Sequence, residues 1–270
     1  MSLPPSIKNR KTFIIVDWEG QKEGDKVLIY GDSGIGKTTL ASLAPNSVFI
    51  GVDDGGRKMT HPVTGKRLKV IPNIMSFADV RDALHQISLF DNYETIVIDN
   101  ITELERWALP YTFATVPKEK GQIAKNVEDY GWHKGYRYWY DTMRLILQDC
   151  DTLVRKGKNI ILVAQGTTIE TVNTGGENFL KEAPELYHDK NVSTLNAYVS
   201  WCDHVFRIGY TSVSVEHQKA ASTQERAIFV CPEIHFIAKS RNASLEECKV
   251  ISFANKKDDS IWKFLLNEKH

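Results

Sequence analysis

An α/β fold with a mostly parallel central sheet is predicted by three features of the sequence. Short apolar runs that end in a polar residue, at residues 27–30, 48–52 and 93–99, alternate with segments of helical periodicity. That alternation is typical of parallel strands joined by helical crossovers. A glycine-rich turn directly follows the first run, and the 270 residues, 42% of them hydrophobic, suffice for one large domain with a full core.

The composition limits what the chain can bind from a distance. Lys and Arg together number 34, as do Asp and Glu, so the formal net charge is zero. Any contact with nucleic acid must then come from local patches, because a neutral protein has no summed field to steer a polyanion. The four cysteines share no C-x-x-C spacing, and no apolar run approaches the length of a membrane span. We therefore expect reduced thiols, no membrane partner and a cytoplasmic location.

Residues 26–45 carry the strongest functional signal. An apolar strand is followed by Gly31-x-x-x-x-Gly36-Lys37-Thr38 and then by a helix-compatible segment. In such a phosphate-binding loop the glycines let backbone N–H groups surround a polyphosphate, the lysine reaches the β and γ phosphates, and the hydroxyl coordinates Mg²⁺. The pattern predicts that the chain binds ATP with Mg²⁺. The predicted nucleotide-binding residues are Gly31, Asp32, Ser33, Gly34, Ile35, Gly36, Lys37, Thr38 and Thr39.

Three further strands end in polar side chains at the edge of the sheet where open α/β folds bind ligands. Asp53 and Asp54 follow the strand at 48–52, and either could polarise the attacking water, although a solvated Asp-Gly turn is the alternative. Asp99 ends the strand at 93–99 and is the predicted second ligand of Mg²⁺ beside Thr38. Gln165 ends the strand at 159–164, where its amide could sense the γ-phosphate or orient water.

The remaining segments predict one domain with an N-terminal strand and turn (1–25), a core (26–210) and a β-rich part with a terminal helix (211–270). We expect strands at 12–17, 203–208, 226–231, 234–238 and 250–254, a basic hairpin without assigned function at 59–71, and a long polar loop at 166–191. Expected helices begin at Ser76, with Asp79 in capping position, at 101–116 with an interruption at Pro110, at 193–201 and at Ser260.

A segment rich in aromatic and basic residues, 130–140, follows a Gly- and Lys-containing connection. Such interleaving suits base stacking and phosphate contact on a single strand of nucleic acid. The alternative is packing, because Trp139 and Met143 begin a helical stripe that continues to residue 153 and the helix then ends at Gly157. The candidate nucleic-acid contacts in the connection are Trp132, His133, Lys134 and Arg137.

Over residues 26–241, this order of motifs resembles the RecA-like recombinase core. Within that class it is most similar to small bacteriophage ATP-binding proteins of single-strand annealing and recombination. Those proteins similarly pair a Gly-Lys-Gly-Tyr-type segment, here His-Lys-Gly-Tyr at 133–136, with a late Ala-Lys-x-Arg, here at 238–241. The resemblance implies a DNA-dependent ATPase that acts on single-stranded DNA, forms a ring or filament of identical subunits, and works in the bacterial host cytoplasm if phage-encoded.

The same resemblance assigns roles to further residues. It puts Asp53 in the place of the family's catalytic glutamate, a departure from the pattern that leaves the choice between Asp53 and Asp54 open. It makes the segments at 111–135 and 167–191 DNA-binding loops. It makes Lys239 and Arg241 fingers that reach a neighbouring subunit's γ-phosphate, with two solvated cations in a turn as the alternative.

Two other classes of protein share the phosphate-binding loop. A small-molecule kinase would normally have an arginine-rich lid over the phosphates, and the sequence has no such cluster. A non-catalytic, nucleotide-regulated assembly module would keep Lys37 and Asp99 but need no base. Zinc is not predicted, because Cys202 with His204 and Cys231 with His235 lack a matching cluster of ligands.

Overall fold

A computed structural model describes residues 15, 23–131, 133–172, 175–211, 213–216, 219–222 and 225–266. The strand predicted at 12–17 lies outside the described residues, apart from Ile15, which belongs to no strand.

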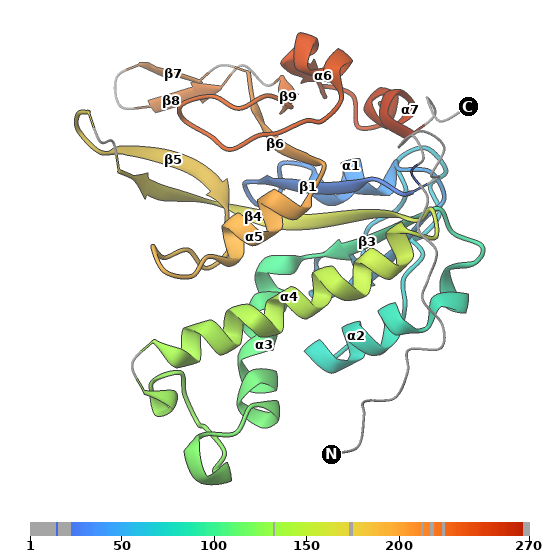
Figure 1. Ribbon diagram of the computed structural model, residues 1–270. Coiled ribbons are helices and arrows are strands. Elements are labelled where there is room, and N and C mark those ends of the chain that lie inside the picture. Colours follow the sequence, from blue (N-terminus) through green and yellow to red (C-terminus); the bar gives the residue numbers. More distant parts are fainter. Residues whose placement is uncertain are drawn as a thin grey trace.

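The chain folds around one central sheet whose strands run in the order β10-β9-β6-β1-β4-β3-β2 (Figure 1). Five strands pair in parallel through their neighbours: β1 (Lys26–Gly31), β2 (Ser47–Gly51), β3 (Thr95–Asp99), β4 (Asn159–Thr171) and β6 (His204–Tyr210). The antiparallel strands are β5 (Phe179–Pro184) beside β4, β9 (Arg226–Phe229) and β10 (Val250–Ser252) at one edge, and a separate pair, β7 (Val213–Glu216) and β8 (Lys219–Ser222). The predicted mostly parallel sheet with a β-rich C-terminal part is confirmed, and the structure adds that the C-terminal strands are antiparallel.

Helices cover both faces of the sheet (Figure 1). One face carries α2 (Phe77–His85), α3 (Ile101–Thr115), α4 (Lys134–Val154) and α5 (Thr194–Trp201), and the other carries α1 (Lys37–Ser42), α6 (Ala243–Cys248) and α7 (Ser260–Leu266). Single 3₁₀ turns lie at Asp54–Gly56, Ile87–Phe90, Glu119–Gly121 and Glu128–Tyr130. The result is a three-layer architecture, in which a parallel sheet must be buried on both sides.

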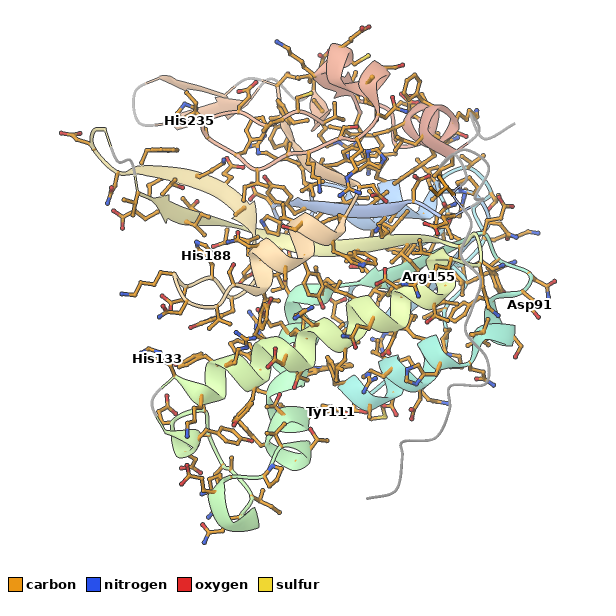
Figure 2. All side chains as sticks on the ribbon, in the orientation of Figure 1. Asp91, Tyr111, His133, Arg155, His188 and His235 are labelled. Carbon is orange, nitrogen blue, oxygen red and sulfur yellow. The ribbon has the colours of Figure 1, made fainter. Side chains whose placement is uncertain are left out.

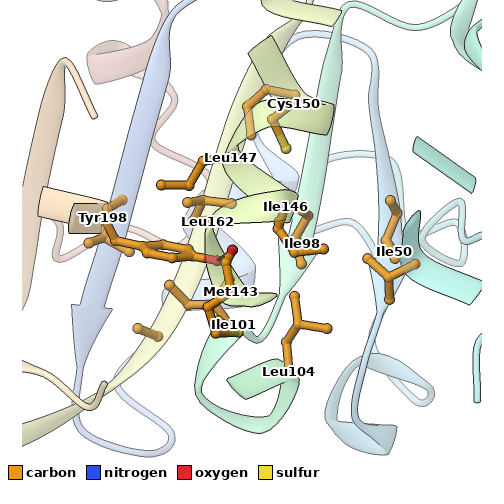
Figure 3. Close-up of a cluster of buried hydrophobic side chains, with 14 of the residues drawn as sticks. Ile50, Ile98, Ile101, Leu104, Met143, Ile146, Leu147, Cys150, Leu162 and Tyr198 are labelled. Carbon is orange, nitrogen blue, oxygen red and sulfur yellow. Dashed lines mark hydrogen bonds between the residues drawn. The ribbon is translucent and has the colours of Figure 1, made fainter. Parts of the chain in front are cut away.

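The central strand β1 shows why its sequence is apolar throughout. Leu28 and Tyr30 pack into the core on the side of α4, whereas Val27 and Ile29 pack into the core on the side of α1. Successive side chains of a strand point to opposite faces, so a strand covered on both faces needs an unbroken apolar run. On the α4 side the Tyr198 hydroxyl donates to the Met143 carbonyl at 2.9 Å, which satisfies the phenol inside the apolar cluster (Figure 3).

The helix starts follow from local capping chemistry. The Ser76 hydroxyl accepts from the Asp79 backbone N–H at 3.2 Å, while the Asp79 carboxylate accepts from the Met75 N–H at 2.9 Å, which confirms the predicted cap of α2. Pro110, in contrast, does not interrupt α3, which is continuous from Ile101 to Thr115. A proline removes one backbone donor, and the buried side chains that hold α3 against the sheet and α4 outweigh that loss.

Two predicted segments differ in the structure, and one helix was not predicted. The polar loop at 166–191 is largely a β-hairpin, because β4 continues past Gln165 to Thr171 and pairs with β5. Its side chains alternate between partly buried and exposed, so no continuous apolar run signals it. Residues 234–238 make only isolated bridges, such as Glu182 with Phe236. The short helix α6, which sequence patterns do not predict, begins where the Asn242 side chain accepts from the Ser244 N–H at 3.0 Å.

Trp262 joins the C-terminal helix to the helix that follows the glycine-rich turn. Its side chain is buried, and its indole N–H donates to the Leu40 carbonyl at 2.7 Å, near the unpaired end of α1.

We expect Trp262→Ala to lower the free energy of unfolding by about 3 to 5 kcal/mol, through the cavity that it leaves. Urea denaturation followed by circular dichroism measures this, with exposed Lys257→Ala as the control. A loss below about 1 kcal/mol would contradict the packing role.

Candidate nucleotide-binding site

The glycine-rich turn between β1 and α1 has the backbone conformation that its glycines predict. Gly34 and Gly36 adopt φ values of 78° and 114°, in the left-handed region that residues with a Cβ avoid. A Cβ at Gly36 would in addition approach the Arg226 guanidinium to 2.7 Å. The tight turn thus depends on glycine both for its conformation and for the space beside it.

Lys37 is the charged centre of this turn. Its side chain is buried, and its ammonium donates to the Gly31 carbonyl, the Asp32 carbonyl and the Gln165 side-chain oxygen, each at 2.8 Å. Burial lowers the pKa of Lys37, although the charges of Asp99 and other carboxylates partly oppose the shift. Among the described residues no carboxylate lies within salt-bridge distance of it. A buried cation held only by neutral oxygens is suited to receive an anionic ligand.

Thr38 and Asp99 come together across the sheet. The Thr38 hydroxyl donates to an Asp99 carboxylate oxygen at 2.6 Å. Burial raises the pKa of Asp99 to about 6, and the hydrogen bond from Thr38 opposes that rise. A hydroxyl oxygen and a carboxylate oxygen at adjoining positions are the donor types that Mg²⁺ prefers, so the residues present fit the predicted ion. Their role as Mg²⁺ ligands stays a prediction.

Asp53 lies beside this pair at the end of the neighbouring strand. One of its carboxylate oxygens accepts from the Asn100 side-chain amide, and the other accepts from the Gly55 N–H at 2.8 Å. Asp53 also lines one cavity of about 260 Å³ together with the glycine-rich turn, Lys37 and Asp99. Asp54 begins the 3₁₀ turn Asp54–Gly56, and its side chain lies outside what the structure describes.

Gln165 connects the site to two other parts of the fold. It is paired with Gly31 across β1 and β4, and this pairing brings its side chain to Lys37. Its backbone N–H donates to the Thr102 hydroxyl at 3.0 Å, and its carbonyl accepts from the Glu185 N–H at 2.8 Å. The residue therefore links the glycine-rich turn to the start of α3 and to the hairpin of β4 and β5.

Arg226 is a residue of this site that sequence reasoning missed. It lies on β9, its guanidinium donates to the Ile35 carbonyl at 3.0 Å, and it stacks over the Phe253 ring at 5.1 Å. It supports the outer side of the glycine-rich turn and is a positioning residue. No local signal could reveal it, because an arginine in a strand 191 positions from its partner has no motif.

The two predicted finger residues have partners within the chain. The Lys239 ammonium donates to the carbonyls of Val199, Ser200 and Cys202, at the C-terminal end of α5, and Arg241 pairs with Asp203 at 2.6 Å. The backbone of Lys239 forms an isolated antiparallel β-bridge with Val205, and Val205 pairs with Leu28 in the first half of β1. Both therefore lie toward the N-terminal ends of the parallel strands, away from Lys37, and each has a partner, although the Arg241 side chain stays exposed.

The aromatic and basic segment is mostly helix and packed side chains. Lys134 begins α4, so Lys134 and Arg137 are helical residues. The sequence pattern predicts a loop for both. Tyr136 stacks on Tyr187 with 5.2 Å between ring centroids, and the Trp139 indole donates to the Glu105 carbonyl at 2.8 Å. Figure 2 shows His133 at the N-terminal end of α4, away from the sheet. Trp132 lies outside the described residues.

These features define the class of protein. A glycine-rich turn after the central strand, a buried lysine, and a Thr–Asp pair at the ends of parallel strands make up a RecA-like P-loop NTPase core. The chain belongs to the AAA domain family, whose model matches residues 23–242. No helix among the described residues is long and apolar enough to cross a membrane.

Two further comparisons complete these findings. The crystal structure of the flagellar accessory protein FlaH from Methanocaldococcus jannaschii matches over 80% of this chain and 90% of that chain. The sequence identity is 12% and the TM-score is 0.37. A search of curated proteins gives no match.

Removing the buried ammonium tests the binding site. We expect Lys37→Ala to weaken Mg·ATP binding about tenfold to a hundredfold, because charge-assisted hydrogen bonds to phosphate contribute about 1.5 to 3 kcal/mol. Asp99→Asn should remove the dependence of affinity on Mg²⁺ and keep most of the Mg²⁺-free binding. Calorimetric titration measures both, with the exposed Lys156→Ala as the control. Unchanged affinity in Lys37→Ala would contradict the assignment.

Proposed function

We propose that the chain hydrolyses Mg·ATP and couples this reaction to single-stranded DNA, in recombination or annealing. The observation that carries the nucleotide half of the proposal is the cavity of about 260 Å³ shared by Lys37, Thr38, Asp53, Asp99 and Gln165. A cation, a metal-binding pair, a carboxylate and an amide there meet the requirements of phosphoryl transfer to water.

Each residue of the cavity has a distinct task in this reaction. Lys37 exchanges its neutral oxygen partners for phosphate oxygens and stabilises the charge that develops there. When bound, Mg²⁺ neutralises phosphate charge, and Thr38 and Asp99 would hold it. Asp53 orients the attacking water and takes its proton, while the Asn100 amide fixes that carboxylate in place. Asp53 is exposed, so water can reach it.

Gln165 provides the proposed coupling to the rest of the molecule. A phosphate that binds Lys37 competes for the ammonium with the Gln165 side chain. Since Gln165 lies where β4 leaves the parallel sheet and enters the hairpin with β5, a change in its position reaches the hairpin directly. The segment at 167–191, proposed to contact DNA, would thereby respond to the nucleotide.

The DNA and assembly halves of the proposal are supported by the sequence resemblance to phage annealing and recombination proteins. Homo-oligomers of this kind would bring Lys239 and Arg241 to a neighbour's nucleotide, and both side chains would first have to leave the carbonyls and the carboxylate that hold them. The cations of the other proposed DNA loop also have acidic partners: Lys134 with Glu119 and Arg137 with Asp141.

A small-molecule kinase is the second candidate, favoured by one observation. A further cavity of about 320 Å³ adjoins the nucleotide cavity and shares Asp53, Met59 and Asp99 with it. An acceptor there would lie beside the reacting phosphate. A kinase would need that acceptor for turnover, whereas an ATPase releases phosphate with water alone.

The identity of the base is tested at Asp53. We expect Asp53→Asn to lower the rate of ATP hydrolysis about a hundredfold or more while it leaves ATP affinity within a few fold, because a base acts mainly in the transition state. Asp54→Asn is the matched control on the adjacent residue. Single-turnover hydrolysis and equilibrium binding measure the two quantities. If only Asp54→Asn loses hydrolysis, Asp54 is the base. Normal rates in both variants would show that neither residue is the base.

Phosphate release with and without single-stranded DNA tests the whole proposal. We expect hydrolysis in the absence of any acceptor, a rise in rate on addition of oligothymidylate, and a turnover per subunit that increases with protein concentration if a neighbour completes the site. Lys37→Ala protein supplies the blank. Hydrolysis that requires a small-molecule acceptor would favour a kinase, ATP binding without turnover would favour an assembly module, and a rate indifferent to DNA would contradict the DNA partner.

A further inference from the structure

The segment after Asp54 concentrates positive charge in a chain that is neutral overall. Residues 55–78, here called the basic segment, contain five Lys and Arg residues and no Asp or Glu. All five side chains are exposed: Arg57, Lys58, Lys66, Arg67 and Lys69. A solvated loop of ordinary composition would mix both signs of charge, as the rest of this chain does. The segment is therefore a local cationic patch, the kind of feature that a neutral protein needs to hold a polyanion.

The five cations have no acidic partner, a property they share with other exposed cations of the described chain such as Arg155 and Lys156. Among the described residues, none of the five takes part in a salt bridge, whereas Lys118, Lys134 and Arg137 each pair with a carboxylate. The contacts that these side chains do make leave their charge uncompensated: Arg67 donates to the Arg57 carbonyl, and Lys69 lies over the Tyr93 ring. A phosphate arriving here would displace water only and break no ion pair.

The basic segment lies along the outermost parallel strand and lines two cavities. Its chain hydrogen-bonds to β2, because the Phe49 N–H donates to the Lys69 carbonyl and its carbonyl accepts from the Ile71 N–H, both at 2.9 Å. The cavity of about 320 Å³ adjoins Asp53, and a second cavity of about 270 Å³ adjoins Ser47 at the other end of β2. Arg67 and Leu68 line both. Since they share these two residues, the cavities adjoin each other along β2, a strand about 16 Å long, and we call the pair the edge groove.

We propose that this edge groove binds single-stranded DNA, with backbone phosphates on the exposed cations and one base in the cavity beside Asp53. The inference deepens the proposed function and rests on it. The cavity suits a base because much of its lining is apolar, with contributions from Phe49, Leu68 and Pro72, while Arg57 and Arg67 also line it. Its volume is at the lower end of the range for small-ligand pockets, which fits one nucleoside.

The arrangement favours a single strand over the other candidate ligands. A duplex keeps its bases stacked inside and could contact only the cations, so no base would occupy the apolar cavity. A small phosphorylated acceptor could use the cavity and its two arginines, but it would leave Lys58, outside both cavities, and Lys66 and Lys69 of the second cavity unexplained. An extended single strand accounts both for the apolar cavity and for the exposed cations that lie outside it. Because Asp53 and Asp99 line both the groove and the nucleotide cavity, a bound base would lie beside the catalytic carboxylate.

Two double variants, each of which removes two positive charges, test the groove. Arg57→Ala with Arg67→Ala removes two cations from it, and Lys256→Ala with Lys257→Ala removes two exposed cations beyond β10, the strand at the opposite edge of the sheet. Fluorescence anisotropy with a labelled oligothymidylate measures the dissociation constant over a range of NaCl concentrations. We expect the groove variant to bind at least about tenfold more weakly, with a salt slope smaller by about 1.4 for two lost phosphate contacts. The control should match the wild type.

A second measurement locates the strand without any substitution. An oligonucleotide with 4-thiothymidine, photo-crosslinked to the wild-type protein and mapped by mass spectrometry, should modify peptides within residues 55–78. Wild-type binding with equal affinity and slope in both variants, or adducts confined to residues 111–137 and 167–191, would overturn the groove and leave the proposed function standing. No binding of oligothymidylate by the wild type, with or without ATP, would overturn both.

Discussion

The site depends on the hydrogen bonds that hold the buried ammonium of Lys37. The ammonium is held by two carbonyls of the turn and by the Gln165 amide oxygen, and none of these carries a full negative charge. Keeping a cation in that place requires a rigid surround. The apolar strand β1 provides it on one side, Arg226 holds the Ile35 carbonyl from outside, and Trp262 holds α1 through the Leu40 carbonyl. The C-terminal third of the chain thus serves the N-terminal motif.

The strand order converts this local motif into a site. Because β4 lies between β1 and β3, Gln165 falls beside Lys37, while Asp99 at the end of β3 still reaches Thr38. The same strand then continues beyond the parallel sheet as one arm of the hairpin with β5. A single strand therefore passes from Gln165, beside Lys37, to exposed residues of the hairpin.

Charge in this protein is balanced in total but uneven in place. Lys134 and Arg137 at the start of α4 pair with carboxylates, and Lys239 is held by carbonyls at the C-terminal end of α5. Those of the basic segment form no salt bridge with any described residue, and Arg57 and Arg67 line the same cavity as Asp53, whose side chain is exposed to solvent. Pairing of this kind cannot be read from composition, since it depends on which side chains the fold brings within reach. It changes which surfaces are available to a polyanion.

The sequence by itself determined the parallel α/β sheet, the glycine-rich turn with Lys37 and Thr38, the polar strand ends at Asp53, Asp99 and Gln165, and the cap of α2 at Ser76. Each of these depends on residues close together in the chain, where periodicity and turn chemistry are decisive. Only the tertiary structure decided that α3 passes through Pro110, that the segment after Gln165 is a hairpin, and that Arg226 supports the turn. The same holds for the partners of Lys239 and Arg241. These outcomes depend on packing and on pairs of residues far apart in sequence, whose energies leave no local pattern.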